Sequence, residues 1–437
     1  MKCNFEDILL LSSEQNFEQK IENLRGAILD AAYWPDGDDR HGALDNIIKQ
    51  VKDRGDDALQ EFGSRFDGAD LMPADFRVTA EELKAAHSSI DGDLLKAIRQ
   101  SIDNVRKYQS EIFVGDKNSH PGIKYTPISR VGVCVPGASA PLPSTVIMTA
   151  VPAQVAGVKE IAVVSPPRYK GNIHPVILAA CHEIGVTEVY KLGGAHAVAA
   201  LAYGTDTIER VYKIVGPGST WVQLAKRMVF GLRVDIDSIA GPSEVLVVAN
   251  KDANPDWVAA DMLSQAEHAP GSAIVFTDSQ RMGHAVLESL SEQVEKLDRS
   301  EDTIRCLKEY SGVAVFDSME QVIEHTNDFA AEHLQIQCGG KSREVADRID
   351  NAGAIFIGPY TPVAVGDYWA GPSHTLPTGT SAKFFSALSS NDFVKSTSII
   401  EYDQKKLAEN ADDIVRLAMT EGLDAHAKSV KIRLEGK

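Results

Sequence analysis

The chain has 437 residues, of which 62 are acidic and 44 basic, so its formal net charge is -18. This length predicts two or more globular parts, and the acidity disfavours nucleic acid and anionic membranes as partners. The apolar run Ile8 to Leu11 is too short for a signal sequence or a membrane span, and the five scattered cysteines contain no Cys-x-x-Cys pair, so we expect a cytoplasmic protein without a disulfide framework.

The first third of the chain is predicted to be helical, because apolar residues recur at three- and four-residue steps in 44–62 and 80–110. From Arg130 onward, short β-branched runs alternate with alanine-rich helical patterns. This alternation predicts a parallel, doubly wound sheet. Its predicted strands are 131–135, 160–164, 188–192 and 213–215, and its predicted helices lie around 174–184, 195–203 and 219–230.

A second group of similar units predicts a second α/β lobe. Its strands are expected at 244–249, 273–276, 312–315 and 354–357, and its helices at 257–267, 280–296 and 319–329. The pattern ends near Pro372, and a last amphipathic helix is predicted from Lys405 to Glu421. This tail has too little apolar material to stand alone, so we expect it to dock on another lobe or another subunit.

Two fragments pair a histidine with an amide or a carboxylate. Gln265 and His268 are three apart in a predicted helix, so both project from one face and can hold one metal ion; a solvated helix face is the alternative. Glu332 and His333 are adjacent before an apolar stretch. The histidine can act as base toward a hydroxyl and the glutamate toward water, and an exposed capping pair is the alternative.

Two further fragments add candidates of the same kind. Asp367 lies in a region rich in glycine and proline with His374 just beyond it, as expected of a loop that shapes a site. His426 follows the last predicted helix. Each of these residues alone has a structural explanation, and the prediction of a site depends on their joint occurrence.

Two glycine-rich turns follow short strands, at Gly137 and at Gly218. Glycine there allows a phosphate to approach backbone N–H groups at a helix start. No Gly-x-Gly-x-x-Gly fingerprint occurs, so nucleotide binding and simple turns both remain open at this point.

Several motifs in order make the chain resemble the histidinol dehydrogenase family. The resemblance runs from Arg54-Gly55-Asp56 and Phe66-Asp67-Gly68 to the last helix. It implies a zinc-dependent, NAD-linked homodimer, with one zinc per subunit, that oxidises L-histidinol to L-histidine through the aldehyde in two hydride transfers, the last step of histidine biosynthesis. The motifs that carry it are Ile239 to Glu244, Ser264 to His268, Ala331 to Leu334, Gly366 to Pro377 and Glu421 to His426.

The resemblance also implies roles for individual residues. Glu332 and His333 match the family's catalytic bases, and the C-terminal tail would complete the partner subunit's site. His374 matches no ligand of the family. The implied zinc ligands are Gln265, His268, Asp367 and His426, and the implied substrate contacts are Ser243, Gln265, His268, His333, Asp367, Glu421 and His426.

The implied fold class is α/β, with two Rossmann-like lobes of the aldehyde-dehydrogenase kind, an N-terminal helical arm and an extended C-terminal tail. The expected bounds are 1–30 for the arm and 386–437 for the tail. Residues 31–130 with 245–385 are expected to form the catalytic lobe that binds zinc and substrate, and residues 131–244 the nucleotide-binding lobe.

Three positions depart from the family's nicotinamide-nucleotide contacts. Cys134, His196 and Ser219 stand where the family has a tyrosine, a glutamine and an asparagine. Backbone contacts by Gly137 and Gly218 use no side chain, so the predicted cofactor-binding set is these five residues. Cys134 could also act as a nucleophile that forms a thiohemiacetal with the aldehyde. The alternative is that Cys134 is a small buried apolar residue without a chemical role.

Other functions remain as alternatives. A member of the same family could oxidise a different small amino or hydroxy alcohol, and the three altered cofactor positions motivate that alternative. A zinc hydrolase in which Glu332 activates water, without a redox step, belongs to a different class. A non-catalytic binding protein is disfavoured by the joint presence of Glu332, His333 and all four implied ligands.

Overall fold

The structure is a computed structural model that describes residues 4–32, 34, 38–115, 122–137, 140–231, 233–239, 241–268, 270–298 and 300–435. Residues 1–3 of the expected arm, Ala138 and Ser139 of the first glycine-rich turn, and Ala240 lie outside the described residues. The chain forms two compact units, Met1–Phe113 with Pro127–Phe393 and Val114–Thr126 with Val394–Lys437. The first unit contains both predicted lobes.

A five-stranded sheet forms one lobe of the first unit. Its order is β5-β4-β3-β6-β7, and all neighbouring strands are parallel. The chain therefore starts in the middle of the sheet, winds outward to one side and then to the other, as in a doubly wound fold. The strands are β3 Arg130–Cys134, β4 Glu160–Val164, β5 Glu188–Tyr190, β6 Lys213–Val215 and β7 Asp235–Ile236.

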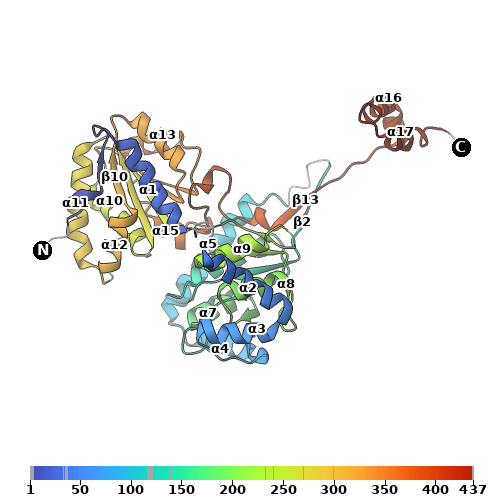
Figure 1. Cartoon of the computed structure of the whole chain (residues 1–437), viewed down its shortest axis with the longest axis horizontal. Helices are drawn as coiled ribbons and strands as arrows, with labels where there is room; N and C mark the ends of the chain where they lie inside the picture. The colour runs from blue at the N-terminus through green and yellow to red at the C-terminus, as the bar shows by residue number, and fades with distance from the viewer. Residues whose placement is uncertain are drawn as a thin grey trace. The chain divides into compact units, whose positions relative to one another are not determined.

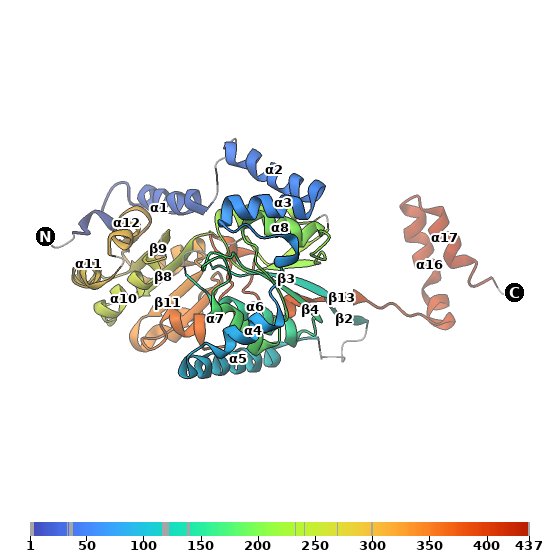
Figure 2. The same cartoon turned by 90° about the horizontal axis from the view of Figure 1, so that it is seen from below.

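Two layers of helices surround this sheet. Helices that follow the strands lie directly on it: α6 Pro143–Val155, α7 Pro175–Ile184, α8 Gly194–Tyr203 and α9 Thr220–Val229. The N-terminal helices pack outside them, with α2 on α8, α4 on α7 and α5 on α6 (Figure 2). These outer helices are α2 Asp39–Arg54, α3 Asp56–Phe62, α4 Ala80–Ser88 and α5 Gly92–Ile112.

Local sequence explains where the outer helices begin and end. Gly55, at φ +57°, separates α2 from α3 inside the stretch predicted as one helix. Thr79 and Glu82 form a capping box that starts α4, and the Asp91 side chain caps α5. The prediction of helices in this region is confirmed, and caps and one glycine divide them.

The packing of these helices differs from the expected grouping of 31–130 with 245–385. The buried face of α2, with Leu44, Ile47 and Val51, belongs to a core that also contains residues of α8 and of the five-stranded sheet. An amphipathic pattern shows that a helix buries one face but does not say which sheet receives it. Helices α2 and α3 therefore add to the lobe of 130–236, and α4 and α5 pack on its helices α7 and α6. The expected domain bounds and the binding roles assigned to the lobes stay predictions.

A six-stranded parallel sheet forms the other lobe, in the order β1-β10-β9-β8-β11-β12. Apart from β1, this is the same winding order as in the first sheet. The short run Leu9–Leu11 of the expected arm is β1 itself, paired with β10. The other strands are β8 Ser243–Ala249, β9 Gly271–Thr277, β10 Gly312–Val315, β11 His333–Gln337 and β12 Ala354–Ile357.

Helices cover both faces of the six-stranded sheet (Figure 1). One face packs against α10 Pro255–Ala266, α11 Gln280–Gln293, α12 Ser300–Tyr310 and α15 Val363–Tyr368. The opposite face packs against α1 Phe17–Ala32, α13 Met319–Phe329 and α14 Ser342–Ala346. Two α/β lobes were predicted, and the structure confirms them.

Short helical turns complete the first unit. They are the 3-10 helices Glu6–Ile8, Pro73–Asp75, Val294–Lys296, Gly339–Lys341, Ser381–Lys383 and Ser390–Phe393 and the π-helical turn Gly63–Asp67. Within the described parts of the chain, no helix combines the length and the apolar character needed to cross a membrane.

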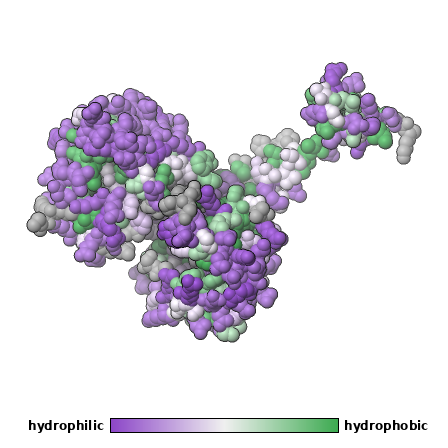
Figure 3. Space-filling view, in the orientation of Figure 1, coloured by the Kyte–Doolittle hydropathy of each residue, from purple (hydrophilic) through white to green (hydrophobic). Residues whose placement is uncertain are grey.

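The second unit is small and has little core of its own. Strands β2 Ile123–Pro127 and β13 Val394–Ser398 form a two-stranded sheet, and α16 Gln404–Thr420 packs on α17 Asp424–Lys431. In these two helices only Ala411 and Ala427 are buried among the described residues. Leu417 is 67% exposed and Ile432 is 66% exposed, and Figure 3 shows apolar surface among the charged residues of this unit. The extended C-terminal tail is confirmed.

Candidate active site

The predicted catalytic pair lies at the amino edge of the six-stranded sheet, where neighbouring parallel strands begin. His333 is the first residue of β11 and is paired with Val245 of β8 and Ala354 of β12. Gln265 and His268 directly precede β9, and Ser243 begins β8. Because parallel strands start at the same edge, residues far apart in the sequence meet there, such as Glu244 and Glu332, which are 88 residues apart.

The segment after β12 returns to the same edge. Asp367 lies in the short helix α15 and not in a loop as predicted, because Gly366 is accommodated inside the helical turn. The chain then runs past the start of β8, where the N–H of Gly379 donates to Glu244 Oε1 at 3.0 Å. The N–H of Gly241 donates to Thr378 Oγ1. A Cβ added at Gly353 would lie 2.6 Å from the Glu332 carbonyl oxygen, so this crossing leaves no room for a side chain.

The His333 ring is fixed at one nitrogen and open at the other. Its Nδ1 donates to the backbone carbonyl of Glu244 at 3.1 Å and lies 3.4 Å from Glu332 Oε2. Its buried Nε2 is 3.7 Å from Asp367 Oδ1 and has no hydrogen-bond partner among the described residues. In the neutral form of the ring, with its proton on Nδ1, Nε2 is the nitrogen that can accept a second proton.

The carboxylates around His333 favour the positively charged form of its ring. Burial lowers the pKa of His333, but the Glu332 and Asp367 carboxylates outweigh it and raise the pKa to about 10. Burial raises the pKa of Asp367, and the imidazoles of His333, His374 and His268 bring it below its usual value. The edge therefore combines buried carboxylates with imidazoles that compensate their charge.

Glu244 is a site residue to which the sequence analysis gave no role. Its carboxyl accepts the N–H of Glu332 at 3.1 Å, and its own N–H donates to Glu332 Oε2 at 2.9 Å. Burial, and then the charge of Glu332, raise the pKa of Glu244 to about 8. The available signal was a glutamate at the start of a strand that is otherwise apolar, Val245 to Ala249.

The predicted ligands of the first unit come from a helix end and from α15. Gln265 is buried at the end of α10, and its carbonyl oxygen accepts the N–H of His268 at 3.2 Å. His268 lies in the turn beyond the end of α10, so the prediction that it shares one helix face with Gln265 is wrong. It is exposed, and its charge acts on Asp367. A Cβ added at Gly271 would lie 2.2 Å from the Gln265 carbonyl oxygen, so the turn into β9 requires glycine.

Among the described residues, no three His, Cys, Asp or Glu side chains gather closely enough to form a metal site by themselves. Of the four predicted ligands, Gln265 is an amide and His426 belongs to the second unit. The first unit therefore contributes one imidazole and one carboxylate from this set, His268 and Asp367. Nitrogen and oxygen donors of this kind suit zinc or another divalent transition metal.

His374 lies beside the same carboxylate without a predicted role. Its Nε2 is buried and lacks a hydrogen-bond partner in the described part of the structure. Burial lowers its pKa, and the charge of Asp367 opposes that effect. An unpaired buried nitrogen next to Asp367 adds a donor atom to this edge.

Four of the five predicted cofactor residues lie at the carboxyl edge of the five-stranded sheet. Cys134 ends β3, Gly137 follows it, and Gly218 and Ser219 follow β6. Strands β3 and β6 are neighbours at the point where the winding direction reverses, which is where doubly wound sheets bind nucleotides.

The Cys134 and His196 side chains are both buried. Burial raises the pKa of the Cys134 thiol to about 12, so the thiol stays protonated and the thiohemiacetal route gains no support. His196 is 1% exposed in α8, with its Nε2 3.4 Å from Asp67 Oδ2 and its ring beside Phe62. Both side chains are packed inside the protein and present no open surface to a cofactor.

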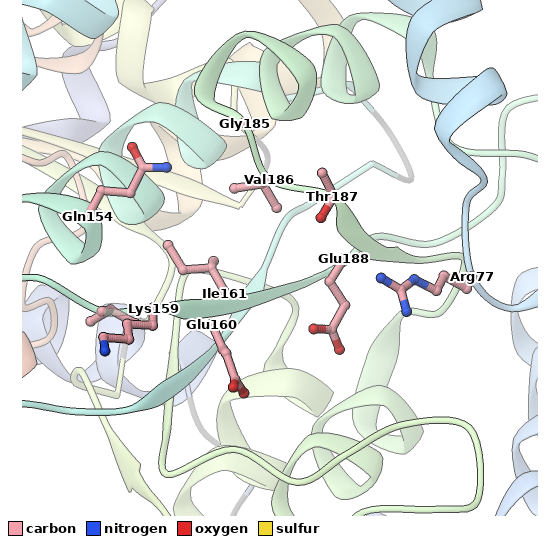
Figure 4. A pocket seen from close by; sticks show the side chains of 10 residues that line it. Arg77, Gln154, Lys159, Glu160, Ile161, Gly185, Val186, Thr187 and Glu188 are labelled. Atoms are coloured by element: carbon pink, nitrogen blue, oxygen red, sulfur yellow. The ribbon is translucent and has the colours of Figure 1, made fainter.

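Two cavities of the first unit lie away from these residues. One, of about 220 Å³, is at the amino edge of the five-stranded sheet, and Figure 4 shows Arg77, Lys159, Glu160 and Glu188 around it. The other, of about 580 Å³, is lined by residues of 52–55 and 203–210. Neither is lined by a predicted catalytic, metal-binding, substrate-binding or cofactor residue.

Comparison with known proteins gives one consistent result. The family model described as histidinol dehydrogenase matches residues 36–434. The histidinol dehydrogenase of Rhodopirellula baltica is 46% identical over 398 residues, 90% of this chain and 86% of the relative, and that of Geobacillus kaustophilus is 44% identical over 424 residues, 95% and 99%. The crystal structure of histidinol dehydrogenase from Elizabethkingia anophelis superposes with a TM-score of 0.90 at 33% identity over 99% of each chain.

Proposed function

Because this chain belongs to the histidinol dehydrogenase family, we propose that it oxidises L-histidinol to L-histidine through the aldehyde, using NAD and zinc. One histidinol, two NAD⁺ and one water give one histidine carboxylate, two NADH and three protons. The observation that carries this proposal is the buried pair at the amino edge, Glu332 and His333, with His333 Nε2 facing Asp367.

Four residues would hold the metal: Gln265, His268 and Asp367 of the first unit and His426 of the second. The donor chemistry of the first three and the unpaired Nε2 atoms of His333 and His374 support this assignment. When bound, zinc would hold the imidazole and the amine of histidinol and so orient its alcohol carbon.

His333 is proposed as the base of the first oxidation, acting from its neutral form, which a divalent cation held beside Asp367 would favour. In that form Nδ1 donates to the Glu244 carbonyl, so Nε2 is the atom that takes the proton from the alcohol hydroxyl. Burial of the ring excludes bulk water from competing for that proton.

Glu332 is proposed as the base of the second oxidation. Its carboxylate is oriented by the N–H of Glu244 and lies beside the His333 ring. From this position it would take a proton from the water that adds to the aldehyde. Two adjacent residues thus serve two successive proton transfers at one edge.

The hydride acceptor would bind at the carboxyl edge of the five-stranded sheet. Gly137 and Gly218 would offer backbone N–H groups, beside Cys134, His196 and Ser219. NAD accepts one hydride in each oxidation. The replaced side chains at these three positions favour one alternative, a relative that oxidises a different small amino or hydroxy alcohol.

The active form is proposed to be a cytoplasmic homodimer. In it Glu421 and His426 of one subunit would complete the site of the other, with Glu421 and Ser243 contacting the substrate. The exposed apolar side chains of the second unit support docking on a partner, since Leu417 and Ile432 are two-thirds exposed.

Steady-state kinetics with L-histidinol test the proposal against its alternatives. We expect kcat/KM for L-histidinol with NAD to exceed that for other small amino alcohols by about 100-fold or more, because unpaired site groups penalise analogues that lack the imidazole. Preference for another alcohol would support the alternative substrate. Folded, metal-loaded protein that forms no NADH with any alcohol would contradict both.

A further inference from the structure

We propose that Glu244 is a positioning residue whose side chain, by holding the backbone N–H of Glu332, keeps the Glu332 carboxylate in place for the second of the two oxidations. This inference rests on the proposed function. Glu244 was not among the predicted site residues, and the proposal gives it a role in the oxidation of the aldehyde.

The side chain of Glu244 joins three segments of the amino edge. Its Oε1 accepts the N–H of Glu332 at 3.1 Å, just before β11, and the N–H of Gly379 at 3.0 Å, in the returning segment. Its backbone N–H, in β8, donates to Glu332 Oε2 at 2.9 Å. Glu332 is therefore held at its backbone and at its carboxylate by the same residue.

Both proposed bases contact the backbone of Glu244, but of the two only Glu332 also hydrogen-bonds to its side chain in the described structure. His333 Nδ1 donates to the backbone carbonyl of Glu244, which every substitution retains. The Glu332 backbone is held by the Glu244 side chain, which a substitution can remove. Truncation of the side chain should therefore disturb Glu332 more than His333.

The environment of Glu244 also indicates which substitute will replace it. The side chain is buried, with 1% of the residue exposed, and burial together with Glu332 raises its pKa to about 8. A neutral carboxyl group is therefore the main form at pH 7. Glutamine is also neutral, has nearly the same shape and keeps an oxygen to accept both N–H groups.

The test separates the two oxidations in the full-length, zinc-loaded enzyme. NADH formed per histidinol consumed is counted, and released aldehyde is captured with a carbonyl reagent. We expect Glu244→Ala to slow aldehyde oxidation about 10-fold or more beyond any loss in alcohol oxidation, because a base contributes about 100-fold or more only when correctly placed. The NADH count should fall from two toward one, with aldehyde released, and Glu244→Gln should restore it.

The matched control is Ser342→Ala. Ser342 Oγ accepts the N–H of Cys338 at 2.9 Å and so fixes a backbone N–H at the opposite end of β11. Its loss should lower stability without changing the NADH count. If Glu244→Ala does not fold, Glu244→Asp, which withdraws the carboxyl by one carbon, provides the same comparison.

The possible outcomes are distinct. Equal losses in both oxidations for the alanine or aspartate variant, with the NADH count still at two, would overturn the role of Glu244. Failure of glutamine to restore the count would also overturn it. If the unmodified protein forms no NADH from histidinol, the proposed function itself fails.

Discussion

Replacement of Gly271 by alanine should displace the proposed metal-binding turn. A Cβ at this position would lie 2.2 Å from the Gln265 carbonyl oxygen, whereas carbon–oxygen contacts begin at about 3.3 Å. The chain must therefore move by about 1 Å. The same carbonyl accepts the N–H of His268, so the movement displaces both predicted ligands.

The expected magnitude follows from this displacement. A misplacement of about 1 Å in a positioned group costs roughly 100-fold in rate, and disturbing the supports of metal ligands costs about 10- to 100-fold in affinity. Overpacking costs about 1–3 kcal/mol of folding stability. We therefore expect a folded Gly271→Ala protein with weakened zinc binding and kcat reduced roughly 100-fold.

The assay compares zinc affinity by chelator competition, kcat with L-histidinol, and the thermal unfolding midpoint. Gly340→Ala is the control. Gly340 lies in the same lobe, and a Cβ added there would meet nothing within 4 Å. It should match the unmodified protein in all three measurements. Zinc affinity and kcat of Gly271→Ala within about twofold of the unmodified protein would refute this reasoning.

Three further results are expected. The Arg99 guanidinium, together with His87, lowers the pKa of Glu183 from 4.5 to about 2. Arg99→Ala should therefore reduce stability at pH 7, and in urea unfolding the difference from the unmodified protein should shrink as the pH falls from 4.5 toward 2; a constant difference would contradict this. Iodoacetamide at pH 8 should leave Cys134 unmodified in native protein by peptide mass spectrometry, because its buried thiol stays protonated; rapid alkylation would contradict it. If His426 serves the partner's site, mixing the His333→Asn and His426→Asn variants should recover about a quarter of full activity. Half of the dimers are then mixed, and half of the sites in each mixed dimer are intact. No recovery would place His426 in the site of its own subunit.

The sequence predicted helices that are amphipathic or rich in alanine and missed others for identifiable reasons. α2, α4 and α5 show apolar residues at helical spacing, so they were foreseen. α6 is buried on all sides, with Ser144 to Ala153 inaccessible and Pro152 within it, so its sequence has no helical period. Which sheet α2 covers depends on tertiary packing, and local sequence does not encode it.

The candidate site shows a similar division. Glu332, His333, Gln265 and His268 were identified from motifs, and the strand register explains why they lie at one edge of the sheet. The doubly wound rule directs attention to carboxyl edges, yet these residues lie at the amino edge of their sheet. Glu244 was not singled out, because its contact with Glu332 depends on the pairing of β8 with β11.

The central claim is that this edge, with bound zinc, carries out two successive oxidations of one substrate. The most direct test counts NADH formed per L-histidinol consumed, before chelation, after chelation and after zinc is restored. We expect two NADH per histidinol, no turnover after chelation and recovery with zinc. One NADH per substrate, or full turnover after complete removal of the metal, would contradict this account.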